Sequence, residues 1–314
     1  MALAFLFPGQ GSQAVGMGAE LAEAFAAARA VFEEVDEALG QSLFKLMRDG
    51  PIEDLTLTEN AQPALMAVSL AVMRVLEQEF GVGVRQAGFV AGHSLGEYSA
   101  LAAAGGLGLA DAARLLKLRG QAMQRAVPVG VGAMASLIGP KSDVALAEAA
   151  AAAGSEAGVC VVANDNNHGN VVISGEKAAV ELAIVAAKAL GAKAILLNVS
   201  APFHCPLMRP AAEEMARALE MTEVTAPQAP LVANVTARPV LDPELIRRLL
   251  VEQVTGRVRW RESIAWLAQE GGVTQFAEAG AGKVLTGTVK RIVPDAEAVA
   301  LNGPAELETF AKRL

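Results

Sequence analysis

Hydrophobic positions along the 314-residue chain alternate between short apolar runs and longer stretches with helical spacing. The runs at 2–7 and 89–91 are apolar throughout and are followed by glycine- or serine-containing turns, which predicts buried strands. The stretches at 95–104 and 109–125 carry alanine and leucine at intervals of three and four, which predicts helices. Buried strands that alternate with helices indicate an α/β protein with a mainly parallel sheet.

The middle of the chain has a different order of elements. Its predicted elements are, in order, a strand at 133–138, a helix at 142–153, strands at 159–163 and 171–174, a helix at 176–190 and a strand at 193–199. This βαββαβ order is typical of a ferredoxin-like unit. We therefore expect a small ferredoxin-like subdomain at 129–198, inserted into a larger α/β-hydrolase-like domain formed by 1–128 and 199–314. The active site is expected in the cleft between them.

Composition narrows the class of protein. With 53% hydrophobic residues the chain can bury a large core, but no apolar stretch is long enough for a membrane span and no signal-peptide start is evident, so a cytoplasmic protein is expected. The net charge is −8 and the basic residues lack aromatic partners, so no nucleic-acid partner is expected. Two cysteines, Cys160 and Cys205, predict neither a disulfide framework nor a metal site.

The most informative motif is GHSLG at 92–96, where an apolar run gives way to a helical pattern. This position predicts a strand-to-helix elbow with Ser94 as a nucleophile. Side chains at Gly92 and Gly96 would collide with neighbouring backbone in such a turn. The amide of Leu95, at the start of the helix, would face a developing oxyanion. The alternative is a serine that only caps a helix between two turn glycines.

A serine nucleophile needs a base, and the chain offers three histidines. His93 adjoins the serine and is expected to orient or pack. His168 lies in the polar run NDNNHG, which predicts a solvated loop. His204 follows an apolar run and lies in a loop made rigid by two prolines, so we assign it as the base. No aspartate is evident as a third member, and a carbonyl that orients the imidazole would leave a Ser94–His204 dyad.

Arg119 is the second diagnostic residue. It aligns with leucine, alanine and methionine on the apolar side of its predicted helix, so it is expected to point inward. A buried guanidinium needs an anion, which is either an internal carboxylate or a bound ligand. A ligand would be an acyl group that carries its own carboxylate.

The glycine-rich loop PGQGSQAVG follows the first predicted strand. Gly9, Gly11 and Ala14 match a dinucleotide-binding pattern, but the acidic residues about 20 positions later lie in a helical pattern, which weakens that interpretation. We favour a loop that covers Ser94 and supplies a second oxyanion amide, from Gln10.

Taken together, these residues resemble one family, the malonyl-CoA:acyl carrier protein transacylases and related acyltransferase domains. The resemblance covers essentially the whole chain and rests on FPGQGSQ, NAQPAL, GHSLGEYSA, LRGQAMQ, GAMAS, VVISG, SAPFHCPLM and GKVLTG, in that order. The chain departs from the usual pattern at Ala281, where proline is common, and at 168–170.

The resemblance implies a role for each matching residue. Ser94 would be the nucleophile, His204 the base and Arg119 the carboxylate-binding residue; the further implied positions are Gln10 and Leu95 for the oxyanion hole, Gln253 for the carbonyl that orients the histidine, and Gln62 and Asn164 for the acyl or pantetheine channel. Leu95 and Phe203 resemble a malonyl-selective pattern, since a bulky phenylalanine crowds an α-methyl group.

The implied activity is transfer of a malonyl group from malonyl-CoA to the phosphopantetheine thiol of acyl carrier protein, by a ping-pong mechanism through a malonyl-serine. No permanently bound cofactor and no metal are expected, and the protein is expected to be a monomer. Because carrier proteins are acidic, a local basic patch must bind them. The candidates are Arg257, Arg259 and Arg261, then Lys188 and Lys193, then Lys290 and Arg291. A serine esterase and a non-catalytic carrier-binding module are the alternatives.

Overall fold

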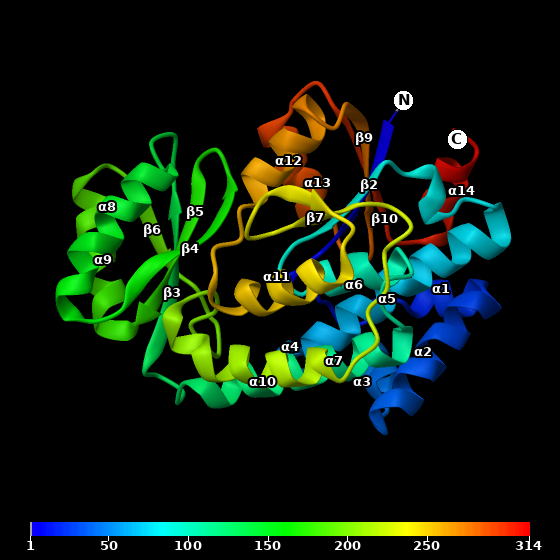
Figure 1. Cartoon of the computed structure of the whole chain (residues 1–314), viewed down its shortest axis with the longest axis horizontal. Helices are drawn as coiled ribbons and strands as arrows, with labels where there is room; N and C mark the ends of the chain where they lie inside the picture. Colours follow the sequence, from blue (N-terminus) through cyan, green and yellow to red (C-terminus); the bar gives the residue numbers. More distant parts are fainter. Residues whose placement is uncertain (1) are drawn as a thin grey trace.

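The computed structural model describes residues 2–314 and contains two sheets, each with its own set of helices (Figure 1). The larger sheet has the strand order β10-β9-β1-β2-β7-β8, and its neighbouring strands are parallel except for the β7–β8 pair. Its strands are β1 (Ala2–Phe7), β2 (Phe89–Gly92), β7 (Leu231–Ala233), β8 (Arg238–Val240), β9 (Val273–Ala279) and β10 (Glu297–Leu301). The expectation of an α/β protein with a mainly parallel sheet is confirmed.

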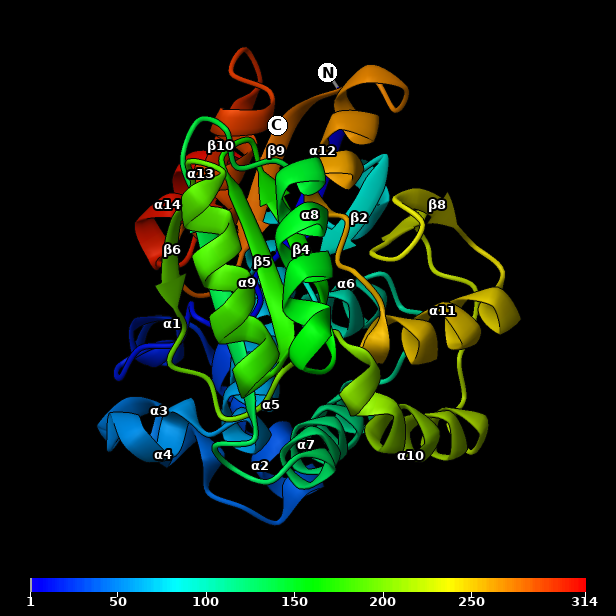
Figure 2. The same cartoon turned by 90° about the vertical axis from the view of Figure 1, so that its left-hand side faces the viewer.

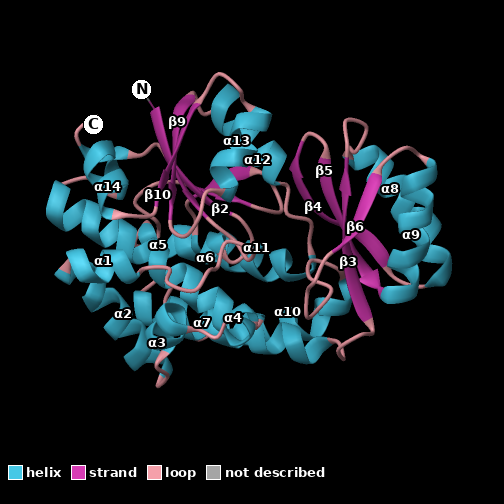
Figure 3. Ribbon diagram, turned by 180° about the vertical axis from the view of Figure 1, so that it is seen from behind, coloured by secondary structure: helices cyan, strands magenta, loops and turns pink. Residues whose placement is uncertain are grey.

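Helices cover both faces of this sheet (Figure 3). Along β1, Phe5 and Phe7 pack into one hydrophobic core, whereas Ala4 and Leu6 pack into another on the opposite face, which is why this strand is apolar at every position. The helices are α1 (Ala19–Ala24), α2 (Ala26–Leu39), α3 (Leu43–Asp49), α4 (Ile52–Thr56), α5 (Thr58–Phe80), α6 (Gly96–Ala103), α7 (Leu109–Ala126), α10 (Arg209–Glu220), α11 (Pro243–Thr255), α12 (Trp260–Gln269), α13 (Val284–Ile292) and α14 (Pro304–Ala311). Within the described part of the chain, no helix is both long and apolar enough to cross a membrane.

The smaller sheet is antiparallel and has the order β4-β5-β3-β6. Two helices, α8 and α9, cover one of its faces (Figure 2). In chain order the elements are β3 (Gly132–Ile138), α8 (Val144–Gly154), β4 (Cys160–Asn167), β5 (Asn170–Glu176), α9 (Lys177–Ala189) and β6 (Lys193–Leu196). This is the order that the sequence pattern predicts.

Two boundaries in this region were predicted wrongly. The strand expected to reach residue 199 ends at Leu196, and β4 runs on through the polar residues that were expected to form a loop. The reason lies outside the strand: the buried carboxylate of Asp165 pairs with Arg261 at 2.8 Å, and its backbone N–H donates to the carbonyl of Val258. Polar side chains are compatible with a buried strand when a neighbouring segment supplies their partners.

The junction between β2 and α6 is as tight as the GHSLG pattern predicts. A Cβ on Gly92 would lie 1.8 Å from the carbonyl oxygen of Gly96, and a Cβ on Gly96 would lie 2.2 Å from that of Phe7. Both obstacles are backbone atoms, which cannot move aside as a flexible side chain can. The two glycines therefore allow α6 to begin directly against the ends of β1 and β2.

We expect Gly96→Ala to destabilise the protein by about 2–3 kcal/mol, because the added methyl group overlaps the backbone of β1. Gly287→Ala in α13 is the matched control, since nothing lies within 4 Å of the place that its methyl group would occupy. Because alanine favours a helix more than glycine does, this substitution should be neutral or stabilise the protein by up to about 1 kcal/mol. Urea denaturation of both variants measures the difference. Equal stability of the two would show that the elbow is not sterically restricted.

Candidate active site

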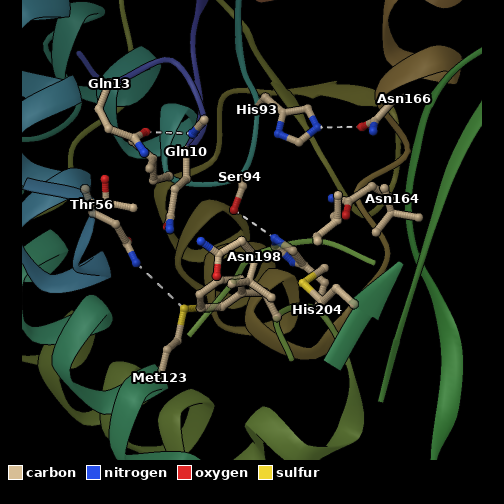
Figure 4. Close-up of a pocket in the computed structure, with 18 of the residues that line it drawn as sticks. Gln10, Gln13, Thr56, His93, Ser94, Met123, Asn164, Asn166, Asn198 and His204 are labelled. Carbon is tan, nitrogen blue, oxygen red and sulfur yellow. Dashed lines mark hydrogen bonds between the residues drawn. The ribbon is translucent and has the colours of Figure 1, made fainter. Parts of the chain in front are cut away.

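A pocket of about 340 Å³ lies where the two sheets approach each other. Side chains from the elbow, from α7 and from the small sheet reach it, and Figure 4 shows the central ones. Its lining includes every predicted site residue except Gln253, which lies directly behind it: Gln10, Gln62, Ser94, Leu95, Arg119, Asn164, Phe203 and His204. The structure therefore brings together residues that are spread over most of the chain.

Ser94 occupies the elbow with a left-handed backbone, at φ 55°. A non-glycine residue in this region is strained and needs support from its surroundings. Two side chains give that support: the Ser94 N–H donates to Asn234 Oδ1 at 2.8 Å, and its carbonyl accepts from Gln253 Nε2 at 2.8 Å. The hydroxyl is thereby fixed at the floor of the pocket.

His204 lies 110 positions later and also has a left-handed backbone, at φ 57°. Its Nε2 is 2.8 Å from Ser94 Oγ, and its Nδ1 is 2.9 Å from the backbone carbonyl of Gln253 (Figure 4 shows the first contact). Because a carbonyl only accepts, the proton of the neutral ring resides on Nδ1 and Nε2 is left with a lone pair toward the serine. This arrangement suits general-base activation of an alcohol.

Burial and the charge of Arg119 lower the pKa of His204 to about 3. Burial removes the water that would stabilise the imidazolium, and the nearby guanidinium repels it. The ring is therefore neutral at neutral pH and ready to accept a proton. The carbonyl of Gln253 replaces a carboxylate as the group that orients it.

Arg119 is buried, with 1% of its surface exposed, as its position on α7 predicts. Its guanidinium donates to Gln62 Oε1 at 2.7 Å, to Gln253 Oε1 at 2.8 Å and to Ser94 Oγ at 3.2 Å. All three acceptors are neutral, and none of the ion pairs formed among residues 2–314 includes Arg119. The sequence left two anions open as partners for Arg119, an internal carboxylate and a bound ligand. No internal carboxylate among residues 2–314 contacts the guanidinium directly.

Two backbone amides border the same pocket. The N–H groups of Gln10 and Leu95 donate to no protein acceptor within residues 2–314, and both residues line the cavity. The side chain of Gln10 is held by Thr58, whose hydroxyl donates to Gln10 Oε1 at 2.9 Å. A Cβ on Gly9 would lie 2.7 Å from the carbonyl oxygen of His93, so the glycine-rich loop packs directly on the elbow. These amides are free to bind an anionic oxygen.

The other two histidines and the neighbouring cysteine have separate positions. His93 is buried, its Nε2 lies 2.9 Å from Asn166 Oδ1 and its ring meets Trp260 edge-on, which fits a packing role. His168 is exposed in the turn between β4 and β5. The Cys205 thiol donates to the carbonyl of Pro202 at 3.0 Å, and burial raises its pKa, so it is not poised as a nucleophile.

Sequence reasoning missed two residues of this network, Asn234 and Glu97. Asn234 follows β7 and contacts the elbow from 140 positions away, so no local pattern indicates it. Glu97 lies inside the recognised motif, but its buried contacts with Asn234 and Gln253 are visible only in the fold. Across residues 2–314, no cluster of three or more histidine, cysteine, aspartate or glutamate side chains is placed to hold a metal ion.

Comparison with known proteins shows the family to which the chain belongs. An acyl transferase domain model matches residues 4–304. The malonyl CoA-acyl carrier protein transacylase of Salmonella typhimurium is 46% identical over 305 residues, which is 97% of each chain. The crystal structure of acyl-carrier-protein-S-malonyltransferase from Bartonella henselae superposes with a TM-score of 0.97 at 55% identity. The match covers 100% of this chain and 99% of the Bartonella chain.

A second solved structure contains a partner. It is a malonyl-transacylase in complex with a type II PKS acyl-carrier protein, with a TM-score of 0.95, 45% identity and full coverage of both chains. The chain belongs to the acyl transferase family and is an acyltransferase. Within that family its similarity is to the malonyl CoA-acyl carrier protein transacylases.

The His204 ring should remain neutral at a pH of about 5.5, a full unit below the ordinary pKa of histidine, because burial and Arg119 disfavour its charged form. Imidazole nitrogen chemical shifts measured during an NMR titration test this. Only three histidines are present, so His204→Gln assigns the signal by its loss. An imidazolium shift for His204 at that pH would contradict the described environment.

Proposed function

We propose that this acyltransferase moves a malonyl group from malonyl-CoA to the phosphopantetheine thiol of acyl carrier protein, through a malonyl-Ser94 intermediate. The observation that carries the proposal is Arg119: a buried cation with neutral partners, 3.2 Å from a serine hydroxyl that itself contacts a neutral histidine. An acyl group that ends in a carboxylate fits both parts of that site: its carboxylate can bind Arg119 while its carbonyl carbon reacts with Ser94. The names of the relatives support the same substrates.

The first half-reaction forms the acyl-enzyme. His204 Nε2 accepts the Ser94 proton as Oγ bonds to the thioester carbon, and the amides of Gln10 and Leu95 stabilise the negative oxygen. The C–S bond then breaks, and the departing thiolate of CoA receives the proton from the imidazolium. Each half-reaction therefore begins and ends with a neutral histidine.

The second half-reaction reverses these steps with a different thiol. His204 takes the proton of the carrier's pantetheine, the sulfur attacks the malonyl ester, and Ser94 Oγ leaves and recovers the proton. Arg119 holds the malonyl carboxylate through both steps by charge-assisted hydrogen bonds. Gln62 keeps the guanidinium in place from the opposite side, and Asn164, on β4, borders the route for the pantetheine arm.

Two pocket residues are proposed to select the acyl group. Leu95 is buried at the elbow, and Phe203 lies beside His204, where it packs against the apolar cluster of Met134, Ala163 and Val172 in the small sheet. An α-methyl group would crowd this apolar wall. We therefore propose a preference for malonyl over methylmalonyl, of the size that one methyl group gives in a hydrophobic pocket, about 1–3 kcal/mol.

We further propose a division into a discontinuous α/β-hydrolase-like domain at 1–128 and 199–314 and a ferredoxin-like subdomain at 129–198. The separate hydrophobic core of the small sheet, drawn from residues 133–192, supports this division. The protein is proposed to act as a monomer in the cytoplasm, without a resident cofactor. Two buried free cysteines are consistent with a reducing compartment.

The carrier-binding surface is proposed to include exposed lysines of the small subdomain. Of the candidate groups, Arg257, Arg259 and Arg261 each form an ion pair, with Glu148, Glu262 and Asp165 respectively. Their charge is therefore largely compensated. Lys188 at the end of α9, Lys193 at the start of β6, and Lys290 and Arg291 of α13 are exposed and form none of the ion pairs found in residues 2–314. We favour Lys188 and Lys193 as contacts for an acidic carrier, because β6 leads directly into residues 197–199, which line the pocket.

Intact-protein mass after brief mixing with malonyl-CoA tests the central proposal. Wild type should gain a malonyl adduct, Ser94→Ala none, and Arg119→Ala should load malonyl about 100-fold more slowly while gaining relative preference for acetyl-CoA. Arg114→Ala, on the exposed face of the same helix, is the control and should load like wild type. Release of CoA without an adduct would indicate a hydrolase instead.

Reversing charge at Lys188 and Lys193 together should raise the KM for acyl carrier protein about tenfold at low salt and leave transfer to free pantetheine unchanged, because only the docking step uses the surface. Lys45→Glu, a change at an exposed side chain of α3, should alter neither quantity. Steady-state transfer at low and high salt measures the effect. An unchanged KM at both salt concentrations would remove these lysines from the docking surface.

A further inference from the structure

Glu97 is a buried carboxylate for which the mechanism has no role. It lies on α6, one helical turn after Ser94, and 1% of its surface is exposed. It takes part in none of the ion pairs among residues 2–314; instead its Oε2 accepts from Gln253 Nε2 at 2.8 Å and from the backbone N–H of Asn234 at 3.1 Å. A buried charge is costly unless such contacts hold it for a purpose.

The two partners of Glu97 are the two residues that hold the strained elbow. Asn234 accepts from the Ser94 N–H at 2.8 Å and donates to the carbonyl of Gly92 at 2.7 Å, so it spans the turn. Gln253 donates to the Ser94 carbonyl at 2.8 Å. One carboxylate oxygen thus connects both supports of the nucleophile.

Glu97 acts together with the Ser94 carbonyl and Arg119 to set which way the Gln253 amide faces. An ionised carboxylate only accepts, so the NH₂ of Gln253 must point toward it, and Oε1 then points toward Arg119, at 2.8 Å. A flipped amide would bring NH₂ against the guanidinium and oxygen against the carboxylate. With the amide in its observed orientation, Arg119 is held by an oxygen that a substrate carboxylate can outcompete.

We propose that Glu97 is a positioning residue, which acts through Asn234 and Gln253 to fix the Ser94 elbow and the direction of Arg119. It touches neither substrate nor a reacting atom. The inference rests on the proposed function, since the role of Arg119 in binding an acyl carboxylate is part of that proposal. Glu97 would thus act from behind the pocket, with the side-chain amide of Gln253 between its carboxylate and the guanidinium of Arg119.

The charge state of Glu97 gives the proposal a signature. Burial raises its pKa to about 7, against the opposing effects of Gln253, Asn234 and Arg119. The ionisable groups that interact with it are Tyr98 on its own helix and Arg119 on α7, whereas Asn234, which follows β7, and Gln253 on α11 present amides. As pH falls through 7 the carboxylate becomes a neutral carboxylic acid, which can donate as well as accept, so its contribution to the orientation of Gln253 weakens while those of Ser94 and Arg119 remain.

The test is the rate of Ser94 acylation by malonyl-CoA and by acetyl-CoA, measured by rapid quench and mass spectrometry for wild type and Glu97→Gln. We expect wild-type malonyl loading to decline as pH falls from about 8 to about 6, and Glu97→Gln to load about 30-fold more slowly at the upper pH with no such dependence. Its ratio of malonyl to acetyl loading should fall about tenfold, because Gln253, one of the two amides that hold Arg119, is oriented less firmly.

Glu278→Gln is the matched control. Glu278 is equally buried, and its carboxylate accepts from the backbone N–H groups of Leu285 and Thr286, away from the pocket. It should keep wild-type loading rates and selectivity even if its stability changes.

Glu97→Gln with wild-type rate, selectivity and pH profile would overturn the proposal. If that variant does not fold, the wild-type profile decides: malonyl loading that is constant between about pH 6 and 8 would overturn it equally. Failure of the proposed function is distinguishable, because wild type itself would then form no malonyl adduct.

Discussion

Gln253 forms hydrogen bonds with all three central residues of the site, Ser94, Arg119 and His204. Its backbone carbonyl orients His204, its side-chain oxygen accepts from Arg119, and its side-chain nitrogen donates to the carbonyl of Ser94. Helix α11 therefore contacts the proposed nucleophile, the proposed base and the buried cation at once. Ser94 and His204 both have left-handed backbones; Gln253 holds the Ser94 carbonyl and the His204 ring, and Asn234 holds the Ser94 N–H.

The site keeps the guanidinium of Arg119 buried and yet available to an anion that enters the pocket. A carboxylate in direct contact with Arg119 would stabilise the empty protein, but a substrate would have to displace it. Neutral amide oxygens from Gln62 and Gln253 hold the guanidinium less tightly and leave it able to bind an incoming anion. Together with burial, the same charge lowers the pKa of His204, so in the proposed mechanism the residue that binds the acyl carboxylate also helps to keep the base neutral. That mechanism couples binding and catalysis through one side chain.

Features that depend on local sequence could be predicted. The apolar run of β1, the glycines of the elbow and the inward position of Arg119 follow from periodicity and from backbone sterics within a few residues. The pairing of Ser94 with His204 could be predicted only because the chain has few histidines and resembles a known family. The support from Asn234 could not, since it joins positions 140 residues apart. The extension of β4 was missed because its polar residues find partners in a distant segment.

A crystal structure of the protein after brief exposure to malonyl-CoA would show whether Ser94 carries the acyl group and Arg119 binds its carboxylate. We expect continuous density from Ser94 Oγ to a malonyl group, with its carboxylate about 3 Å from the Arg119 guanidinium and its ester oxygen facing the amides of Gln10 and Leu95. A malonyl group attached to another residue, or a carboxylate directed away from Arg119 into solvent, would contradict it.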